Sequence, residues 1–117
     1  SEQVNSFIKD WNTVAAIQAQ QQLLVILQEL VNEVASYSPQ TPEMNNARLI
    51  YLEALRNYYQ GNAKILESLQ LSTNILTISR AQVVLQEAKQ YIDKANQLVA
   101  RYNETKNKLH LQLFGSP

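Results

Sequence analysis

One short stretch decides the fold: Ser38-Pro39-Gln40-Thr41-Pro42-Glu43. Each proline lacks a backbone N–H and disfavours helix at the residue before it, so a helix that reaches this stretch ends there. A new helix can start within the same stretch, because Thr41 is a good N-cap and Pro42 suits the first helical position. Glu43 adds a negative charge near the positive end of the helix dipole. We therefore expect two helices joined by a tight turn.

Apolar residues recur at helical spacing on both sides of this turn. The first segment covers residues 3–37 and contains neither Gly nor Pro. The second covers 42–71 and has one weak point at Gly61-Asn62, where we expect a kink or, as the alternative, a break that would make four helices. The third covers 75–113, with apolar residues at close to a 3.5-residue spacing. The sequence predicts an all-α, elongated antiparallel three-helix bundle.

The composition agrees with this fold and excludes several classes of function. The 117 residues suit a single domain, 1–117, and contain two Gly and three Pro, whereas an average chain of this length has roughly eight and six. Ten basic residues balance ten acidic ones, so the phosphate neutralisation that drives nucleic-acid binding is not expected. The longest apolar run is Leu23-Leu24-Val25-Ile26-Leu27, far short of the roughly twenty residues of a membrane span. We expect no nucleic-acid partner and no membrane insertion within this chain.

Catalytic and metal-binding chemistry has few candidate residues. The chain has no Cys and one His, and this His110 has Asn107 three residues before it where a di-iron bundle would have Glu. Two separated Gly cannot form a phosphate-binding loop, and no Gly-x-Ser-x-Gly motif offers a nucleophile. Glu29 and Glu33 share one helix face, as is usual on a solvated surface. The prediction is a protein that is not an enzyme and has no cofactor and no metal site.

Excess apolar width gives the first candidate binding surface. Five consecutive apolar residues from Leu23 to Leu27 point all round a helix, and Val83 to Leu85 repeats this broadening. Tyr is enriched at interfaces, although it is also ordinary at the rim of a helical core. The candidate interaction surface consists of Leu23, Leu24, Ile26, Leu27, Tyr51 and Tyr59. The alternative is burial of these residues within the monomer.

Amides give the second candidate, since the chain has fourteen Gln and eleven Asn. Counting from the turns places one set of polar residues at a common height: Gln18, Gln21, Gln22, Arg56, Asn57, Tyr58, Asn96 and Gln97. Pointing inwards, they would form a buried hydrogen-bonded layer or a site for a small polar ligand. The alternative, which we favour, leaves the amides mostly on the surface.

The zero net charge is a cancellation between the outer helices. The first 37 residues carry four acidic and one basic side chain, and residues 75–113 carry six basic and three acidic ones. We expect these two helices to lie parallel and side by side, with their opposite charges favouring that packing, although exposed pairs contribute only about 0–1 kcal/mol each. Ordinary solvated faces are the alternative.

The architecture resembles spectrin-like repeats, which have a Trp early in their first helix as this chain has Trp11. Those repeats are highly charged and this chain is amide-rich, so the resemblance implies no function. We expect a non-enzymatic interaction or assembly module, part of a larger protein or of a homo-oligomer, with a protein partner or a second copy as its binding partner. The alternative is an extracytoplasmic ligand-sensing bundle with a polar site in its middle layer. Absent Cys and many amides suit an extracytoplasmic bacterial domain slightly better than a cytoplasmic one.

Overall fold

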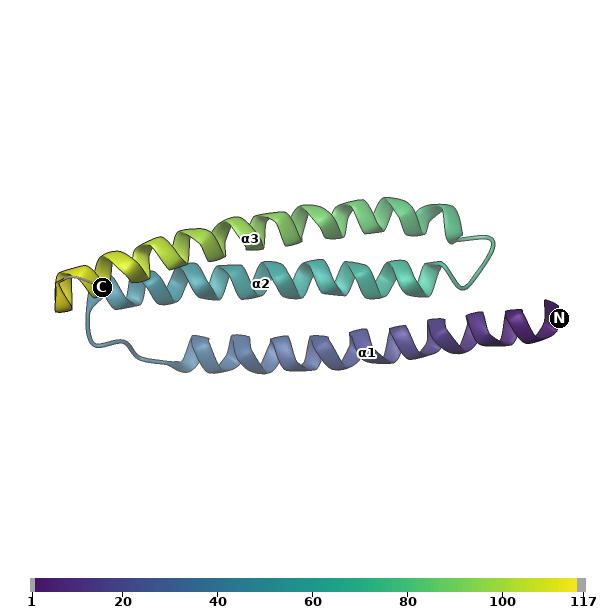
Figure 1. The fold of residues 1–117 in the computed structure, drawn as a ribbon, viewed down its shortest axis with the longest axis horizontal. Helices are drawn as coiled ribbons and strands as arrows, with labels where there is room; N and C mark the ends of the chain where they lie inside the picture. Colours follow the sequence, from purple (N-terminus) through teal and green to yellow (C-terminus); the bar gives the residue numbers. More distant parts are fainter. Residues whose placement is uncertain (1, 116–117) are drawn as a thin grey trace.

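Three long helices form the protein in the computed structural model, which describes the backbone of residues 2–115 and the side chains of residues 12–115 (Figure 1). They are α1 (Glu2–Ser36), α2 (Pro42–Leu71) and α3 (Ile78–Phe114). They run up, down and up along a body of 65 × 24 × 22 Å. Its radius of gyration is 19.1 Å, against about 13 Å for a compact domain of this length. The predicted elongated antiparallel three-helix architecture is confirmed; the side chain of Trp11 lies outside the described residues.

The turn between α1 and α2 forms as predicted. Thr41 has an extended backbone, and its hydroxyl accepts a hydrogen bond from the backbone N–H of Met44 at 3.1 Å. Pro42 is the first residue of α2, and Glu43 lies in the first turn. These local preferences act within a few residues, so their effect can be read from the sequence.

Arg48 closes the end of α1 in a way that local sequence does not indicate. Its Nη1 donates to the backbone carbonyls of Val34 and Ala35, both at 3.2 Å, while Nε and Nη2 donate to Oδ1 of Asn45. The last turn of α1 contains no basic residue. Arg48, a residue of α2, therefore supplies the C-terminus of α1 with the positive charge and the hydrogen-bond donors that a helix C-terminus favours.

The connection between α2 and α3 is longer than predicted, because α3 begins at Ile78 and not at residue 75. Oδ1 of Asn74 accepts a hydrogen bond from the backbone N–H of Leu76 at 2.9 Å, and the hydroxyl of Thr77 donates to the Leu71 carbonyl at 2.7 Å. Such side-chain bonds compete with helical backbone bonds. Ile75 and Leu76 are left 88% and 86% exposed in the turn.

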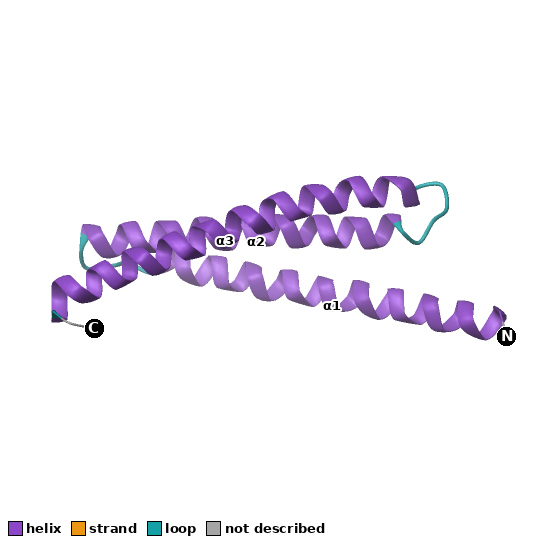
Figure 2. Cartoon of the chain, turned by 45° about the horizontal axis from the view of Figure 1, so that its top comes forward, coloured by secondary structure: helices purple, strands orange, loops and turns teal. Residues whose placement is uncertain are grey.

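Helices α2 and α3 lie side by side (Figures 1 and 2). Small residues that recur every seven positions lie at their contact. The buried small residues are Ala47, Ala54, Gly61 and Ser68 on α2 and Ala81, Ala88 and Ala95 on α3. The antiparallel register brings Ser68 to Ala81, where the Ser68 hydroxyl donates to the Ala81 carbonyl at 2.7 Å. A seven-residue repeat keeps one stripe of each helix facing its partner, and small side chains on that stripe let the backbones approach closely.

Gly61 belongs to this close approach. A Cβ atom built at Gly61 would lie 2.6 Å from Cδ1 of Ile92 and 3.2 Å from the carbonyl oxygen of Ala88. The helix is continuous from Pro42 to Leu71, so the alternative of a break at Gly61-Asn62 is wrong. The glycine provides room for α3.

Within the part of the chain that the structure describes, α1 packs on α2 and not on α3. Val31 is buried in a cluster with Leu52 and Leu55, and Nε2 of Gln20 donates to the side-chain and backbone oxygens of Asn62 at 2.8 and 2.9 Å. No Cα atom of the described α1 lies within 8 Å of one in α3, and Figure 2 shows α1 at an angle to the other two helices. The prediction that α1 and α3 lie side by side is wrong, because they cover different faces of α2.

Candidate functional site

Residues from all three helices line a groove beside the α1–α2 turn, which we call the end groove. Its volume is about 550 Å³. Its walls are mostly apolar and include residues from every helix: Leu30, Val34, Tyr37, Met44, Ala47, Tyr51, Tyr102, Leu109, Leu113 and Phe114. The rings of Tyr51 and Tyr102 bring α2 and α3 together here, with their centroids 4.9 Å apart.

The end groove also contains polar side chains from each helix: Glu33, Arg48, Lys106 and His110. Arg48 is occupied with the end of α1. Glu33 and Lys106 line the same groove, yet their charged atoms form no ion pair within 4 Å in the described chain. The groove thus combines an apolar lining with an acidic and a basic side chain that remain available.

A longer apolar surface continues from the end groove along α1 and α3. On α1, the residues preceding Glu33 on the same face are Leu30, Ile26 and Leu23, at steps of three or four. On α3, the residues that precede Lys106 at steps of seven are Val99, Ile92, Leu85 and Ile78. Because Glu33 and Lys106 both line the end groove, the two stripes continue from the groove along the same side of the bundle. The described parts of the two helices that carry them do not pack together. We call these seven apolar residues the open face.

The open face is less exposed beside the end groove than further away from it. Leu30, Ile92 and Val99 are partly buried. Leu23 is 37% exposed, Ile26 53%, Leu85 48% and Ile78 50%. Apolar side chains at these positions would be buried if α1 and α3 closed against each other, and the angle of α1 prevents this (Figure 2).

The predicted interaction surface is divided by the structure. Leu23 and Ile26 lie on the open face, whereas Leu24 and Leu27 are partly buried. Tyr51 is partly buried against Tyr102, and Tyr59 is also partly buried. The structure therefore brings two of the six predicted residues together on one exposed face. None of the six predicted residues belongs to α3. The apolar residues that recur every seven positions from Ile78 onward were the signal that could have indicated the α3 half of this face.

The predicted middle polar layer is mostly on the surface, as the favoured alternative had it. Six of its members are exposed: Gln18, Gln21, Gln22, Arg56, Asn96 and Gln97. The partly buried Asn57 donates to the Glu53 carbonyl on its own helix, and the hydroxyl of Tyr58 bonds to Oδ1 of Asn96. Gln20 meets Asn62, so the α1 amides lie further along α2 than the predicted height of Arg56 to Tyr58.

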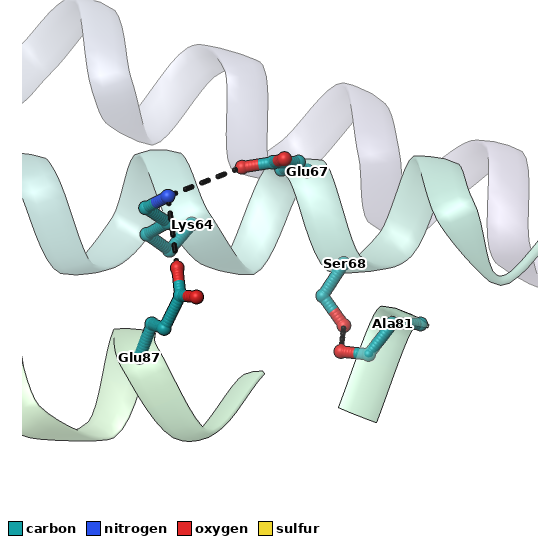
Figure 3. A network of polar contacts seen from close by, with 5 residues as sticks. All are labelled: Lys64, Glu67, Ser68, Ala81 and Glu87. Atoms are coloured by element: carbon teal, nitrogen blue, oxygen red, sulfur yellow. Dashed lines mark hydrogen bonds and ion pairs between the residues drawn. The ribbon is translucent and has the colours of Figure 1, made fainter. Parts of the chain in front are cut away.

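Ion pairs join α2 to α3 (Figure 3), and no ion pair of the described residues involves the end groove or the open face. Nζ of Lys64 lies 2.9 Å from a carboxylate oxygen of Glu87 and 3.6 Å from one of Glu67. The hydrogen bond with Glu87, followed by the charges of Glu87 and Glu67, raises the pKa of Lys64 above its ordinary value of 10.5. The contact between α2 and α3 therefore has ion pairs of its own, whereas the open face has none in the described chain.

The described residues contain neither a metal-binding cluster nor a membrane-spanning helix. No group of three or more His, Asp or Glu side chains is placed to hold a metal ion. None of the described helices has the length and apolar character needed to cross a membrane.

No family model, no curated protein and no solved structure matches this chain. Its function is therefore inferred from its residues and their geometry.

Proposed function

We propose that this protein is a non-enzymatic assembly module that binds another protein through the open face. The observation that carries the proposal is the uncovered apolar stripe of α3, in which Ile78 and Leu85 are 50% and 48% exposed. Ile26 on the facing side of α1 is 53% exposed. Removing apolar area from water gains about 25 cal/mol per Å², so a helix laid between α1 and α3 would gain from both stripes. Exposed apolar residues that share one face of a protein are typical of protein-binding sites.

A site-specific photo-crosslinking amino acid tests this proposal. It would be placed at Leu85, on the open face, and in a matched control at the neighbouring exposed residue Gln86, which points away from that face. In the cells that make the protein, we expect covalent protein adducts after illumination from position 85 and few or none from position 86. Equal adducts from both positions, or none from position 85, would contradict the proposal.

A second candidate function is supported by a different observation, the end groove. Its volume of about 550 Å³ lies within the roughly 300–1,000 Å³ of small-molecule sites, which are mostly apolar with a few polar groups. Lys106 in the groove has no carboxylate partner in the described chain. These features suit an elongated apolar molecule with an acidic head, and they favour the end of the bundle over its middle as the ligand site of the sensing alternative.

Thermal unfolding with matched ligands tests this second candidate. Decanoate and decanol share an alkyl chain and differ in the charged head. A ligand at 100 times its Kd stabilises the folded state by about 2.7 kcal/mol, so we expect decanoate to raise Tm more than decanol does. Lys106→Met should remove that difference. No rise in Tm with either ligand would count against the end groove as a binding site.

A further inference from the structure

We infer that the partner of the open face is a second copy of this chain, with α1 of each copy packed against α3 of the other. This inference rests on the proposed assembly function and names its partner. It follows from two properties of α1 and α3 that the single chain leaves unused: complementary apolar stripes and opposite charge.

The charges of α1 and α3 are complementary and do not meet within one chain. The described side chains of α1, residues 12–36, include Glu29 and Glu33 and no Lys or Arg. Along α3, residues 78–114, six basic side chains outnumber three acidic ones. No Cα atom of the described α1 lies within 8 Å of α3, and the ion pairs of the described residues lie within α2 or between α2 and α3. Lys94 pairs with Glu53 of α2, and Arg80, Arg101 and Lys108 share its stripe of α3 at multiples of seven residues. Lys106, however, lines the end groove together with Glu33, and these two side chains are both open to a partner of opposite charge.

A second copy offers both missing surfaces at once. In a two-fold dimer the same patch is used twice, so α1 meets α3 of the partner while α3 meets α1 of the partner. The helices match in length, with 35 residues in α1 and 37 in α3. A foreign helix would have to supply an apolar stripe with the correct charges on each side, whereas a second copy already carries both.

The end groove determines how the two copies are aligned. Glu33 and Lys106 both line it, so they lie at the same height along the bundle. A two-fold axis parallel to the long axis preserves this height and brings Glu33 of one copy level with Lys106 of the other. Leu23 and Ile26 precede Glu33 by ten and seven residues, so they then lie level with residues 96 and 99 of the partner's α3, next to Ile92 and Val99 of its apolar stripe. Apolar contacts would hold the middle of the interface, and the charge pair would set its register.

Sedimentation velocity of the full chain tests the inference, at concentrations from about 10 μM to about 1 mM, because self-association depends on concentration. We expect a species with twice the 13.4 kDa mass of one chain. Leu85→Glu and Ile26→Glu place a charge on the open face and should each weaken the dimer by about 100-fold or more. The matched control Gln86→Glu, on the exposed outer side of α3, should leave the dimer unchanged, and circular dichroism should show equal helix content in all variants.

A charge exchange tests the alignment. Glu33→Lys and Lys106→Glu should each weaken the dimer by about 10-fold, since each creates a like-charge pair across the interface. The double variant restores opposite charges and should recover much of the loss. If the single variants have no effect, the alignment is wrong.

The outcomes separate this inference from the proposed function. A chain that stays monomeric at the highest concentration, or a dimer that tolerates both glutamate substitutions, overturns the second copy as partner. If position 85 still gives adducts to a different protein, the assembly function stands with another partner. If position 85 gives no adducts and the chain is monomeric, both proposals fail.

Discussion

Gly61→Ala sets helix propensity against close packing at the α2–α3 contact. In an uncrowded helix, replacing an interior Gly by Ala stabilises the folded state by about 1 kcal/mol. At Gly61, however, the new Cβ would lie 2.6 Å from Cδ1 and 2.9 Å from Cγ1 of Ile92, and 3.2 Å from the carbonyl oxygen of Ala88. The Ile92 side chain can rotate away at a rotamer cost of about 0.5–1.5 kcal/mol. The carbonyl belongs to the backbone, so relieving that contact requires α2 and α3 to separate.

The balance favours destabilisation. Inserting a methyl group into a well-packed contact costs about 1–3 kcal/mol, and the propensity gain offsets about 1 kcal/mol of this. We therefore expect Gly61→Ala to lower the free energy of unfolding by about 1 kcal/mol. Ile92→Val removes Cδ1, the atom nearest to the new methyl group, at a cost of its own of about 0.5–1.5 kcal/mol. In that background Gly61→Ala should be close to neutral, which gives a coupling energy of about 1 kcal/mol.

Urea unfolding followed by circular dichroism measures these four proteins, at a concentration low enough to keep the chain monomeric. The matched control is the neighbouring exposed residue Gln60, where the difference between Gln60→Gly and Gln60→Ala reports helix propensity alone. The gain in free energy of unfolding from Gly61→Ala is compared with the difference between Gln60→Ala and Gln60→Gly. If the two values are equal, there is no steric conflict at Gly61. The close approach of α3 at Gly61 would then be refuted, and with it the account of small residues along the α2–α3 contact.

Three further substitutions probe other contacts. Ser68→Ala removes the buried 2.7 Å hydrogen bond to the Ala81 carbonyl, and urea unfolding should show a loss of about 0.5–1.5 kcal/mol; no loss would mean that the bond contributes nothing. Arg48→Met leaves the Val34 and Ala35 carbonyls without their donor and should cost about 1 kcal/mol, with part of the stability retained in Arg48→Lys. Lys64 has a raised pKa, so its stabilisation is fully present below its ordinary pKa of 10.5 and is lost as pH rises through the folded value. The stability difference between the native chain and Lys64→Met should therefore be constant from about pH 8 to about pH 10 and shrink above that; a difference that grows with pH would contradict the assignment.

The sequence by itself determined the helices and the first turn, because the forces involved act within a few residues. Pro39 and Pro42 stop and start helices through their own rings, and Thr41 caps α2 through a bond to Met44. Helical spacing of apolar residues then leaves a helical bundle as the fold. The α2–α3 turn was placed less well, since the hydrogen bond from Leu76 to Asn74 competes with a helix that the same residues could also form.

Only the tertiary structure decided which faces meet. A broad apolar stripe such as Leu23 to Leu27 can pack in several directions with similar gain, because apolar burial has no direction of its own. The buried small residues of α2 and α3 let these two helices pack closely against each other, and α1 packs on another face of α2. That arrangement turns Gly61 from a weak point into a packing site, directs Arg48 to the end of α1, and exposes the face on which the proposed assembly depends.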